Sequence, residues 1–344
     1  MSAERIVATA FAPAEEAVGE GRIPGATLGV VTADGDRAVR VAGSAQAEPE
    51  RVALTRETWF DLASLTKVIL TTTTILRLVA DGRIALDDPL AIAIPDLRQY
   101  DLNAAERRLT FRQCLAHQTH LPAVEPLYTY GHDPETLRAF VLQRVWQAGP
   151  PVYSDINFIL LGIAIERLSG GRLSEIALPE GFSFKPDPER CAATERCTWR
   201  GQVMRGEVHD ENAFALGGAS GHAGLFGHVD GVLDFALTVL RDELLPPHIL
   251  AEMCKPHSTT RALGWEIAHE GWPGGDSCPQ STLGHTGFTG TGLWIGREQG
   301  IAWTLLTNRV HPSRHFDSGI AALRRRVGDL VVSAARHHTT IRPT

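Results

Sequence analysis

The chain has little lysine, little cysteine and no excess of positive charge. Its 33 Lys+Arg and 40 Asp+Glu give a net charge of −7 at pH 7, so neither nucleic acid nor an anionic membrane is an expected partner. No apolar run reaches the roughly 18 residues that a membrane-spanning helix needs. Because 43% of the 344 residues are hydrophobic, the chain can bury a large core, in one large domain or two joined ones.

The cysteines and the N-terminal residues both indicate the cellular compartment in which the protein is expected. The five cysteines are odd in number and include no C-x-x-C pair, which favours reduced thiols. Residues 1–21 carry charged residues such as Glu4, Arg5 and Glu15, and they lack the basic start and continuous apolar stretch of a secretion signal. We therefore expect a cytoplasmic protein.

Lysine is scarce in a way that singles out one position. Only three lysines occur among the 33 basic residues, namely Lys67, Lys185 and Lys255. Where a positive charge suffices the chain uses Arg, so a retained Lys marks a place where an amine that can lose its proton is useful. Lys185 and Lys255 are each followed by Pro in segments typical of a surface, whereas Lys67 follows Ser64 by three residues.

Apolar periodicity and turn residues predict the order of the elements. The predicted elements are a hairpin over 25–44, a helix over 64–81, helical segments over 110–168, an irregular stretch over 179–230, a helix over 229–240, strands over 263–267, 285–295 and 301–308, and a last helix over 313–335. Strands at both ends of the chain, with helices between them, favour a single sheet made from both ends.

This order predicts an α+β fold. An antiparallel sheet is flanked by N- and C-terminal helices, and a mostly helical domain is inserted between its two halves. The predicted domains are residues 1–63 plus 229–344 for the sheet domain and residues 64–228 for the helical domain. We expect the active site between them.

The first chemical motif is Ser64-Leu65-Thr66-Lys67. At this spacing the hydroxyl and the amine share one helix face, and the helix N-terminus favours an oxyanion over an ammonium. Burial would lower the pKa of Lys67 further and leave a neutral amine able to take the Ser64 proton. The alternative is that Ser64 is an ordinary N-cap and Lys67 an exposed residue of the first turn.

Two further motifs follow along the chain. Tyr153-Ser154-Asp155 precedes an apolar helix, and its phenol could relay a proton to a leaving group; the alternative is a packing tyrosine with a capping pair. His285-Thr286-Gly287 opens a strand pattern, and the small residue there would let a substrate lie along the strand edge. The alternative is a tight strand with an incidental histidine.

Taken in order and at these separations, the three motifs resemble the serine β-lactamase and penicillin-binding superfamily. The closer resemblance is to its class C-like branch, together with family VIII carboxylesterases and D-stereospecific peptidases. Flanking segments agree, at residues 60–67, 81–89, 109–117 and 223–226. The resemblance covers nearly the whole chain and implies the same α+β fold.

The resemblance also implies acyl transfer. Ser64 would be the nucleophile, Lys67 its general base, and Tyr153 the group that assists proton transfer. The backbone N–H groups of Ser64 and Phe288 would form the oxyanion hole. Water would then hydrolyse the ester on Ser64, with no metal and no cofactor.

Substrate binding is implied for the strand edge, where His285, Thr286 and Gly287 would contact a carboxylate or a carbonyl group. Three positions depart from the family pattern. Asp155 stands where many relatives have Asn, an amide donor that Asn157 could replace. His285 replaces the more usual Lys and is a weaker, pH-dependent anchor for a carboxylate. His120 stands where Gly is usual, and it either fills part of the pocket or is exposed.

Other residues give weaker evidence for a functional site. Ser220 is a near miss to a G-x-S-x-G elbow, because the fifth residue is His222 and no strand precedes it. His209, Asp210 and His222 fit no standard zinc spacing, so no metal site is predicted.

Three functions stay open. A carboxylesterase acting on small acyl esters is favoured, because both recognition motifs have lost the Lys or Asn that bind amide and carboxylate groups. The first alternative is a β-lactamase or D-amino-acid peptidase, and the second is an inactive relative that serves as a binding module. The partner is thus a small-molecule ester or amide. The sequence leaves open the natural substrate, the oligomeric state and the role of residues 179–225.

Overall fold

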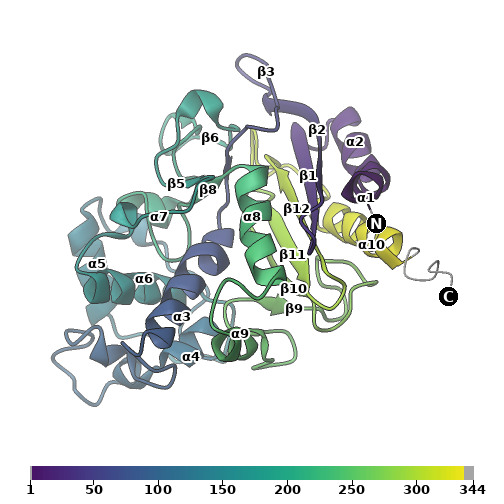
Figure 1. The fold of residues 1–344 in the computed structure, drawn as a ribbon. Helices are drawn as coiled ribbons and strands as arrows, with labels where there is room; N and C mark the ends of the chain where they lie inside the picture. The colour runs from purple at the N-terminus through teal and green to yellow at the C-terminus, as the bar shows by residue number, and fades with distance from the viewer. Residues whose placement is uncertain (1, 337–344) are drawn as a thin grey trace, which may run out of the picture.

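A seven-stranded antiparallel sheet joins the two ends of the chain in the computed structural model (Figure 1). The structure describes residues 2–336; residue 1 and residues 337–344, which the predicted sheet domain includes, lie outside the described residues. The strand order is β3-β2-β1-β12-β11-β10-β9. The strands are β1 (Gly25–Thr32), β2 (Arg37–Gln46), β3 (Val52–Ala53), β9 (Glu266–Ile267), β10 (Leu283–Thr286), β11 (Gly292–Gly296) and β12 (Ile301–Thr307).

N-terminal β1 pairs with C-terminal β12, from Ala26 opposite Thr307 to Thr32 opposite Ile301. The predicted hairpin over 25–44 is confirmed as β1 and β2. The prediction of a single strand over 285–295 is wrong. This segment forms two antiparallel strands, β10 and β11, because the chain reverses through a turn at residues 287–291.

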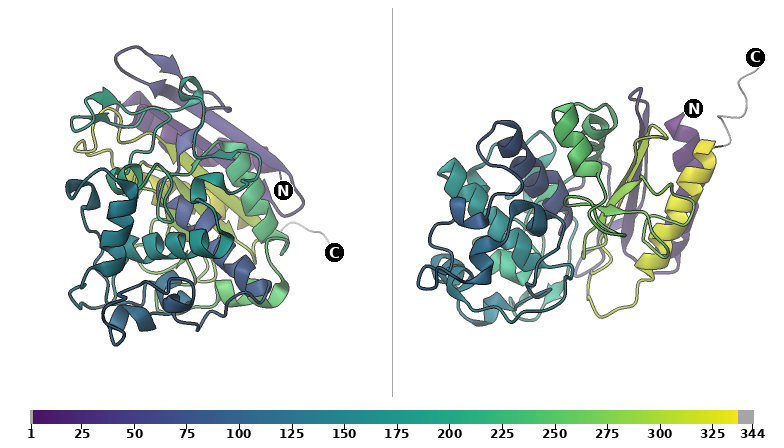
Figure 2. Two further views of the ribbon diagram at one scale, coloured as in Figure 1. Left: turned by 90° about the vertical axis from the view of Figure 1, so that its left-hand side faces the viewer. Right: turned by 90° about the horizontal axis from the view of Figure 1, so that it is seen from below.

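Helices cover both faces of the sheet. Helices α1 (Ala3–Ala10), α2 (Ala12–Gly19) and α10 (Ile320–Arg336) pack on one face, and α8 (Val229–Leu240) packs on the other, between the sheet and the helical part of the chain (Figures 1 and 2). The last helix begins later than the predicted residue 313, because Gly319 has φ +64° and interrupts helical geometry just before it. The α+β prediction is confirmed.

The helical part lies on the far side of α8 from the terminal helices (Figure 2). Its helices are α3 (Thr73–Ala80), α4 (Phe111–Leu115), α5 (Pro134–Gln143), α6 (Asp155–Ser169) and α7 (Glu211–Ala215). Helix α9 (Pro247–Cys254), which belongs to the predicted sheet domain by sequence, packs against α3. Helix α6 is buried on every side from Ile156 to Glu166, which explains its nearly continuous apolar sequence. A π-helical segment, Lys67–Thr72, leads into α3. Short 3₁₀ segments occur at Leu90–Ile92, Ala105–Arg108, Leu127–Thr129, Leu173–Glu175 and Pro188–Arg190.

Two small sheets complete the architecture. The first pairs β4 (Phe60–Asp61) with β8 (Phe226–Gly227) and β8 with β5 (Phe182–Ser183), and the second pairs β6 (Arg196–Cys197) with β7 (Gln202–Val203). Strand β4 leads directly to Ser64. Across residues 2–336, none of the helices combines the length and the apolar character needed to cross a bilayer.

Candidate active site

Ser64 lies on a sharp turn just after β4. The preceding Ala63 has φ +48°, a left-handed conformation that a non-glycine residue adopts only when its surroundings impose it. The Asp61 carboxylate accepts the Ala63 N–H at 2.8 Å and the His209 N–H at 2.6 Å. The buried Asp61 therefore fixes the turn that presents Ser64.

Lys67 is fully buried, and its ammonium has three partners. Nζ lies 2.9 Å from Ser64 Oγ, 3.1 Å from the His222 carbonyl oxygen and 2.8 Å from Asp155 Oδ1. Burial by itself lowers the pKa of this amine, but the Asp155 carboxylate and the Tyr153 phenol outweigh it and raise the pKa to about 12. The expected neutral amine is therefore wrong for the resting site, because Asp155 stabilises the charged form.

Tyr153 lies beside this ammonium, just before the N-cap of α6. Lys67 Nζ is 5.1 Å from the Tyr153 ring centroid, and the Arg261 guanidinium carbon is also 5.1 Å from it. The rings of His117 and His285 lie 4.5 Å and 5.9 Å from the Tyr153 ring. The phenol is thus surrounded by two cationic and two imidazole side chains.

Both imidazoles are uncharged. Burial, with the positive charges of Arg261 and Lys67, holds the pKa of His117 and of His285 well below the usual 6.5. His285 Nδ1 lies 3.0 Å from the Thr286 carbonyl oxygen, so Nδ1 carries the proton and Nε2 is a free acceptor. A neutral His285 cannot attract a carboxylate by charge, which corrects the expectation of a pH-dependent anchor near neutral pH.

The two backbone N–H groups predicted as an oxyanion hole lie on segments that are joined to each other. The Thr289 hydroxyl donates to the Asp61 carbonyl at 2.7 Å, and the Thr291 hydroxyl donates to the Leu62 carbonyl at 3.0 Å. Within residues 2–336, neither the Ser64 N–H nor the Phe288 N–H donates a hydrogen bond to another residue. Both donors are therefore free, and the distance between their segments is fixed by the two threonines.

Gly287 makes this junction possible. A Cβ atom there would lie 2.1 Å from Thr291 Oγ1 and 2.6 Å from the Leu62 carbonyl oxygen. The space beside Gly287 is therefore filled by the protein's own turn. The glycine lets the end of β10 approach the nucleophile turn, and the role of this strand edge in substrate binding stays a prediction.

A cavity of about 520 Å³ opens onto Ser64. It lies between Tyr153 and Asp155 of the helical part and His285 and Thr286 of the sheet. The complete lining is Ala63, Ser64, Val124, Tyr153, Asp155, His209, Asp210, Glu211, Ala223, Arg261, Glu266, Pro273, His285, Thr286, Phe288 and Arg314.

Besides Gly287, two predicted substrate-binding residues are not in this lining. Asn157 is fully buried, and its Oδ1 accepts the Thr119 hydroxyl at 2.8 Å. Two residues along a helix turn a side chain by about 200°, so Asn157 points away from the cavity that Asp155 faces. The His120 ring lies instead near Glu106, with 4.0 Å between Nε2 and Oε1. Neither residue replaces the missing amide donor.

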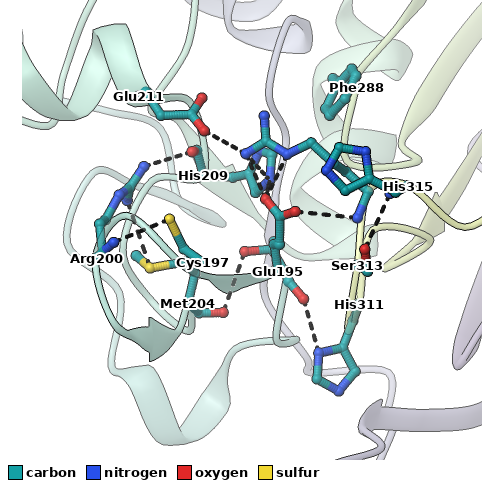
Figure 3. Close-up of polar contacts among 12 residues, drawn as sticks. Glu195, Cys197, Arg200, Met204, His209, Glu211, Phe288, His311, Ser313 and His315 are labelled. Atoms are coloured by element: carbon teal, nitrogen blue, oxygen red, sulfur yellow. Dashed lines mark hydrogen bonds and ion pairs between the residues drawn. The ribbon is translucent and has the colours of Figure 1, made fainter. Parts of the chain in front are cut away.

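One wall of the cavity is an ionic cluster that the sequence motifs did not indicate (Figure 3). The Arg314 guanidinium bonds both Glu195 and Glu211, and His209 Nε2 lies 3.1 Å from Glu195 Oε2. Burial opposes ionisation of Glu195, but these hydrogen bonds lower its pKa to about 2. The Phe288 ring, 50% exposed, stacks on His209 at 5.7 Å. The cluster thus supports an aromatic surface beside the predicted oxyanion hole.

A second polar chain links Ser220, His222 and Asp210. His222 Nδ1 lies 2.9 Å from Ser220 Oγ, and His222 Nε2 lies 2.9 Å from Asp210 Oδ1. Ser220 is buried and outside the cavity lining, so this chain orients His222, whose carbonyl holds Lys67. Asp155, Asp210 and His222 bring metal-ligand atoms within 4.8 Å of one another, and the Lys67 ammonium already bonds Asp155 there.

Sequence reasoning missed Asp61, Asp210, Thr289 and Thr291. Asp61 lies within the resembling segment 60–67 but was given no role, Asp210 was considered only as a metal ligand, and Thr289 and Thr291 belong to no motif. His117, which contacts Tyr153, was also given no role. Its position at the end of the resembling segment 109–117 was the sequence feature that could have indicated it.

Comparisons with known proteins agree with this geometry. The family model described as Beta-lactamase matches residues 11–326. N-acetylmuramyl-L-alanine amidase of Bacillus subtilis is 30% identical, over 74% of this chain and 68% of that protein.

Solved structures share the fold. A class C beta lactamase from Rhodobacter sphaeroides has a TM-score of 0.72 at 20% identity, covering 94% of this chain and 99% of that one. EstCE1, a hydrolase with promiscuous acyltransferase activity, has a TM-score of 0.71 at 21% identity, covering 95% and 99%. The matched family model, which spans nearly the whole chain, establishes that this protein belongs to the beta-lactamase family of serine hydrolases.

Proposed function

We propose that this protein is a carboxylesterase that cleaves small acyl esters through an acyl-enzyme on Ser64. The observation that carries the proposal is the charge state of the two recognition positions. Asp155 is an ion-paired acceptor where an amide donor would bind a substrate amide, and His285 is an uncharged imidazole where a cation would bind a carboxylate. An ester without a carboxylate needs neither contact.

In the proposed reaction, Ser64 Oγ attacks the ester carbonyl and its proton passes to the uncharged form of Lys67, 2.9 Å away. The free N–H groups of Ser64 and Phe288 stabilise the oxyanion. Tyr153, beside Lys67, delivers a proton to the departing alkoxide. Water then attacks the ester on Ser64 and releases the acid.

Asp155 limits how much of Lys67 is uncharged at neutral pH. An ester suits such a site better than an amide, since an alkoxide or phenoxide leaves more easily than an amine and demands less proton transfer in the transition state. The Phe288 ring and Val124, both exposed in the cavity lining, supply apolar contacts for the acyl or alcohol group.

A second candidate is an amidase or peptidase that acts on amino-acyl amides. The identity to N-acetylmuramyl-L-alanine amidase favours it, because that relative is more similar in sequence than the solved structures named above. Binding without catalysis is the third possibility.

The test is the intact mass of the protein after incubation with a fluorophosphonate and, separately, with penicillin G. Wild type, Ser64→Ala and the exposed-serine control Ser174→Ala are compared. We expect fluorophosphonate to add one adduct to wild type and Ser174→Ala and none to Ser64→Ala. Rates with p-nitrophenyl acetate and with an N-acyl-L-alanine amide then separate ester from amide cleavage.

Each outcome decides between the candidates. Faster cleavage of the ester, lost in Ser64→Ala, supports the esterase. A penicillin adduct, or faster cleavage of the amide, supports the second candidate instead. A folded wild-type protein that takes up no fluorophosphonate is the result expected of a binding module.

A further inference from the structure

Arg324 is a buried cation with no carboxylate partner. It lies in α10 and is 8% exposed, and within residues 2–336 it forms no salt bridge. Removing a charge from water is costly unless other groups solvate it. The groups that solvate Arg324 are backbone carbonyls: Nη2 donates to the Gly287 oxygen at 2.8 Å and to the Thr291 oxygen at 2.7 Å.

These carbonyls are the two ends of the turn between β10 and β11. That turn contains Phe288, whose free N–H faces the proposed oxyanion. The Gly287 C=O and the Phe288 N–H belong to the same peptide unit. In a trans peptide these two groups point in opposite directions, so a cation at the oxygen lies behind the N–H.

We propose that Arg324 is a positioning residue that polarises the Gly287–Phe288 peptide and so strengthens the Phe288 N–H as an oxyanion donor. A charge-assisted hydrogen bond to the carbonyl draws electron density toward oxygen and makes the N–H of the same peptide more acidic. The field of the guanidinium adds to the peptide dipole along the same direction. This inference rests on the proposed acyl-transfer function.

The side chain remains charged in spite of its burial. Burial and the nearby Arg309 lower the pKa of Arg324 to about 9, so it is protonated at neutral pH. Glu266 is close enough to oppose this lowering but forms no salt bridge with Arg324, so the direct contacts of the guanidinium are those to the turn carbonyls.

Arg309 is a matched control because it makes the neighbouring contact. Its Nε donates to the Phe288 oxygen at 2.8 Å, which polarises the next peptide, whose N–H belongs to Thr289. Arg309 and Arg324 thus place similar charges on adjacent peptides, and only Arg324 acts on the oxyanion donor.

The experiment compares Arg324→Gln, Arg324→Lys and Arg309→Gln with wild type. The readouts are the rate of acylation by p-nitrophenyl acetate, the affinity for phenylboronic acid, which forms a tetrahedral anion on a nucleophilic serine, and the thermal unfolding midpoint. We expect Arg324→Gln to lower the acylation rate and the boronate affinity by a similar factor, about tenfold, below the 10²–10³ lost with a whole oxyanion donor. KM should change little, because the interaction strengthens only as the anion forms.

Arg324→Lys keeps the charge and should retain most of the boronate affinity, and Arg309→Gln should change it by less than threefold or so. Wild-type boronate affinity in folded Arg324→Gln would overturn the inference, as would equal losses in the Gln and Lys variants. If neither Arg324 variant folds, the residue stabilises the fold and the inference is wrong. A folded wild-type protein that binds no boronate would instead count against the proposed function itself.

Discussion

The Asp155 carboxylate lies 2.8 Å from the Lys67 ammonium, inside the proposed catalytic site. A residue that the family resemblance places among substrate contacts is therefore also the ion-pair partner of Lys67, the predicted general base. Asp155 is on the first turn of α6 and lines the cavity, and Lys67 begins the π-helical segment before α3, buried behind Ser64. This ion pair sets the pH range in which Lys67 can accept a proton.

Replacing Asp155 by Asn should move activity to lower pH. The variant loses the Asp155 carboxylate, the larger of the two groups that raise the pKa of Lys67 to about 12. With only the Tyr153 phenol left to oppose burial, that pKa falls and more neutral amine is present at pH 7. We expect ester cleavage in wild type to keep rising with pH up to pH 9.5. In Asp155→Asn the rise should come earlier, by about one pH unit or more.

The measurement is the pH dependence of kcat/KM for p-nitrophenyl acetate, with Asp81→Asn as an exposed control. Identical pH profiles in wild type and Asp155→Asn would show that Lys67 is not the base. A shift of the Asp155→Asn profile to higher pH would also show that Lys67 is not the base.

Lys67→Arg should leave a folded protein with almost no activity. Arginine keeps the positive charge beside Asp155 and does not lose its proton in proteins, so it cannot act as a base. We expect the acylation rate to fall by about 10²–10⁴-fold, the usual contribution of a general base. Burst kinetics measure this rate, and Lys255→Arg, at an exposed lysine, should match wild type. Retained activity in Lys67→Arg would exclude Lys67 as the base.

Thr291→Val should destabilise the protein and weaken catalysis together. The substitution keeps the shape of the side chain but leaves the Leu62 carbonyl without the hydroxyl that lies 3.0 Å away. The Leu62 carbonyl keeps the Leu65 N–H at 3.0 Å, so the expected loss is that of one hydrogen bond, about 0.5–1.5 kcal/mol. Denaturant unfolding measures this loss, and the acylation rate should drop because the Ser64 and Phe288 segments are no longer held at one separation. A destabilised variant with unchanged kcat would refute the link to catalysis.

His285 should make the protein less stable in acid. Burial, Lys67 and Arg261 lower its pKa in the folded state, so below about pH 6.5 the unfolded chain binds a proton that the folded chain does not. The stability is present above about pH 6.5 and is lost as the pH falls, by up to about 1.4 kcal/mol per pH unit. His285→Gln should show a smaller loss in the free energy of unfolding between pH 7 and pH 5. Equal losses in both proteins would mean that His285 does not titrate as described.

Much of the fold followed from local sequence patterns. Alternating residues around a turn signal predicted β1 and β2, and the apolar run before Leu168 predicted α6. These elements are set by short-range propensities and by the residues that end them. The break between β10 and β11 was not predicted, because the turn at residues 287–291 depends on contacts with distant segments, from Arg324 to the Gly287 and Thr291 carbonyls and from Thr291 to the Leu62 carbonyl.

The motifs by themselves determined which residues meet. Ser64, Lys67, Tyr153, Asp155 and His285 were all named from spacing and resemblance. In the structure four of them line one cavity, and Lys67 lies buried in contact with Ser64 and Asp155. Only the contact between Ser64 and Lys67 is local, since the two residues are three apart at one helix start; the other residues come from distant segments, and the family resemblance predicted that they meet.

Only the tertiary structure decided their charge states and their supports. The pKa of a buried amine depends on whether an anion from another segment lies within a few ångströms, and Asp155 comes from 88 residues farther along the chain than Lys67. The neutral His285, the unpaired Arg324 and the Arg314 cluster beneath Phe288 likewise depend on contacts between distant segments. Such contacts leave no periodic signal in the sequence, because electrostatic energy follows distance in space and burial rather than position along the chain.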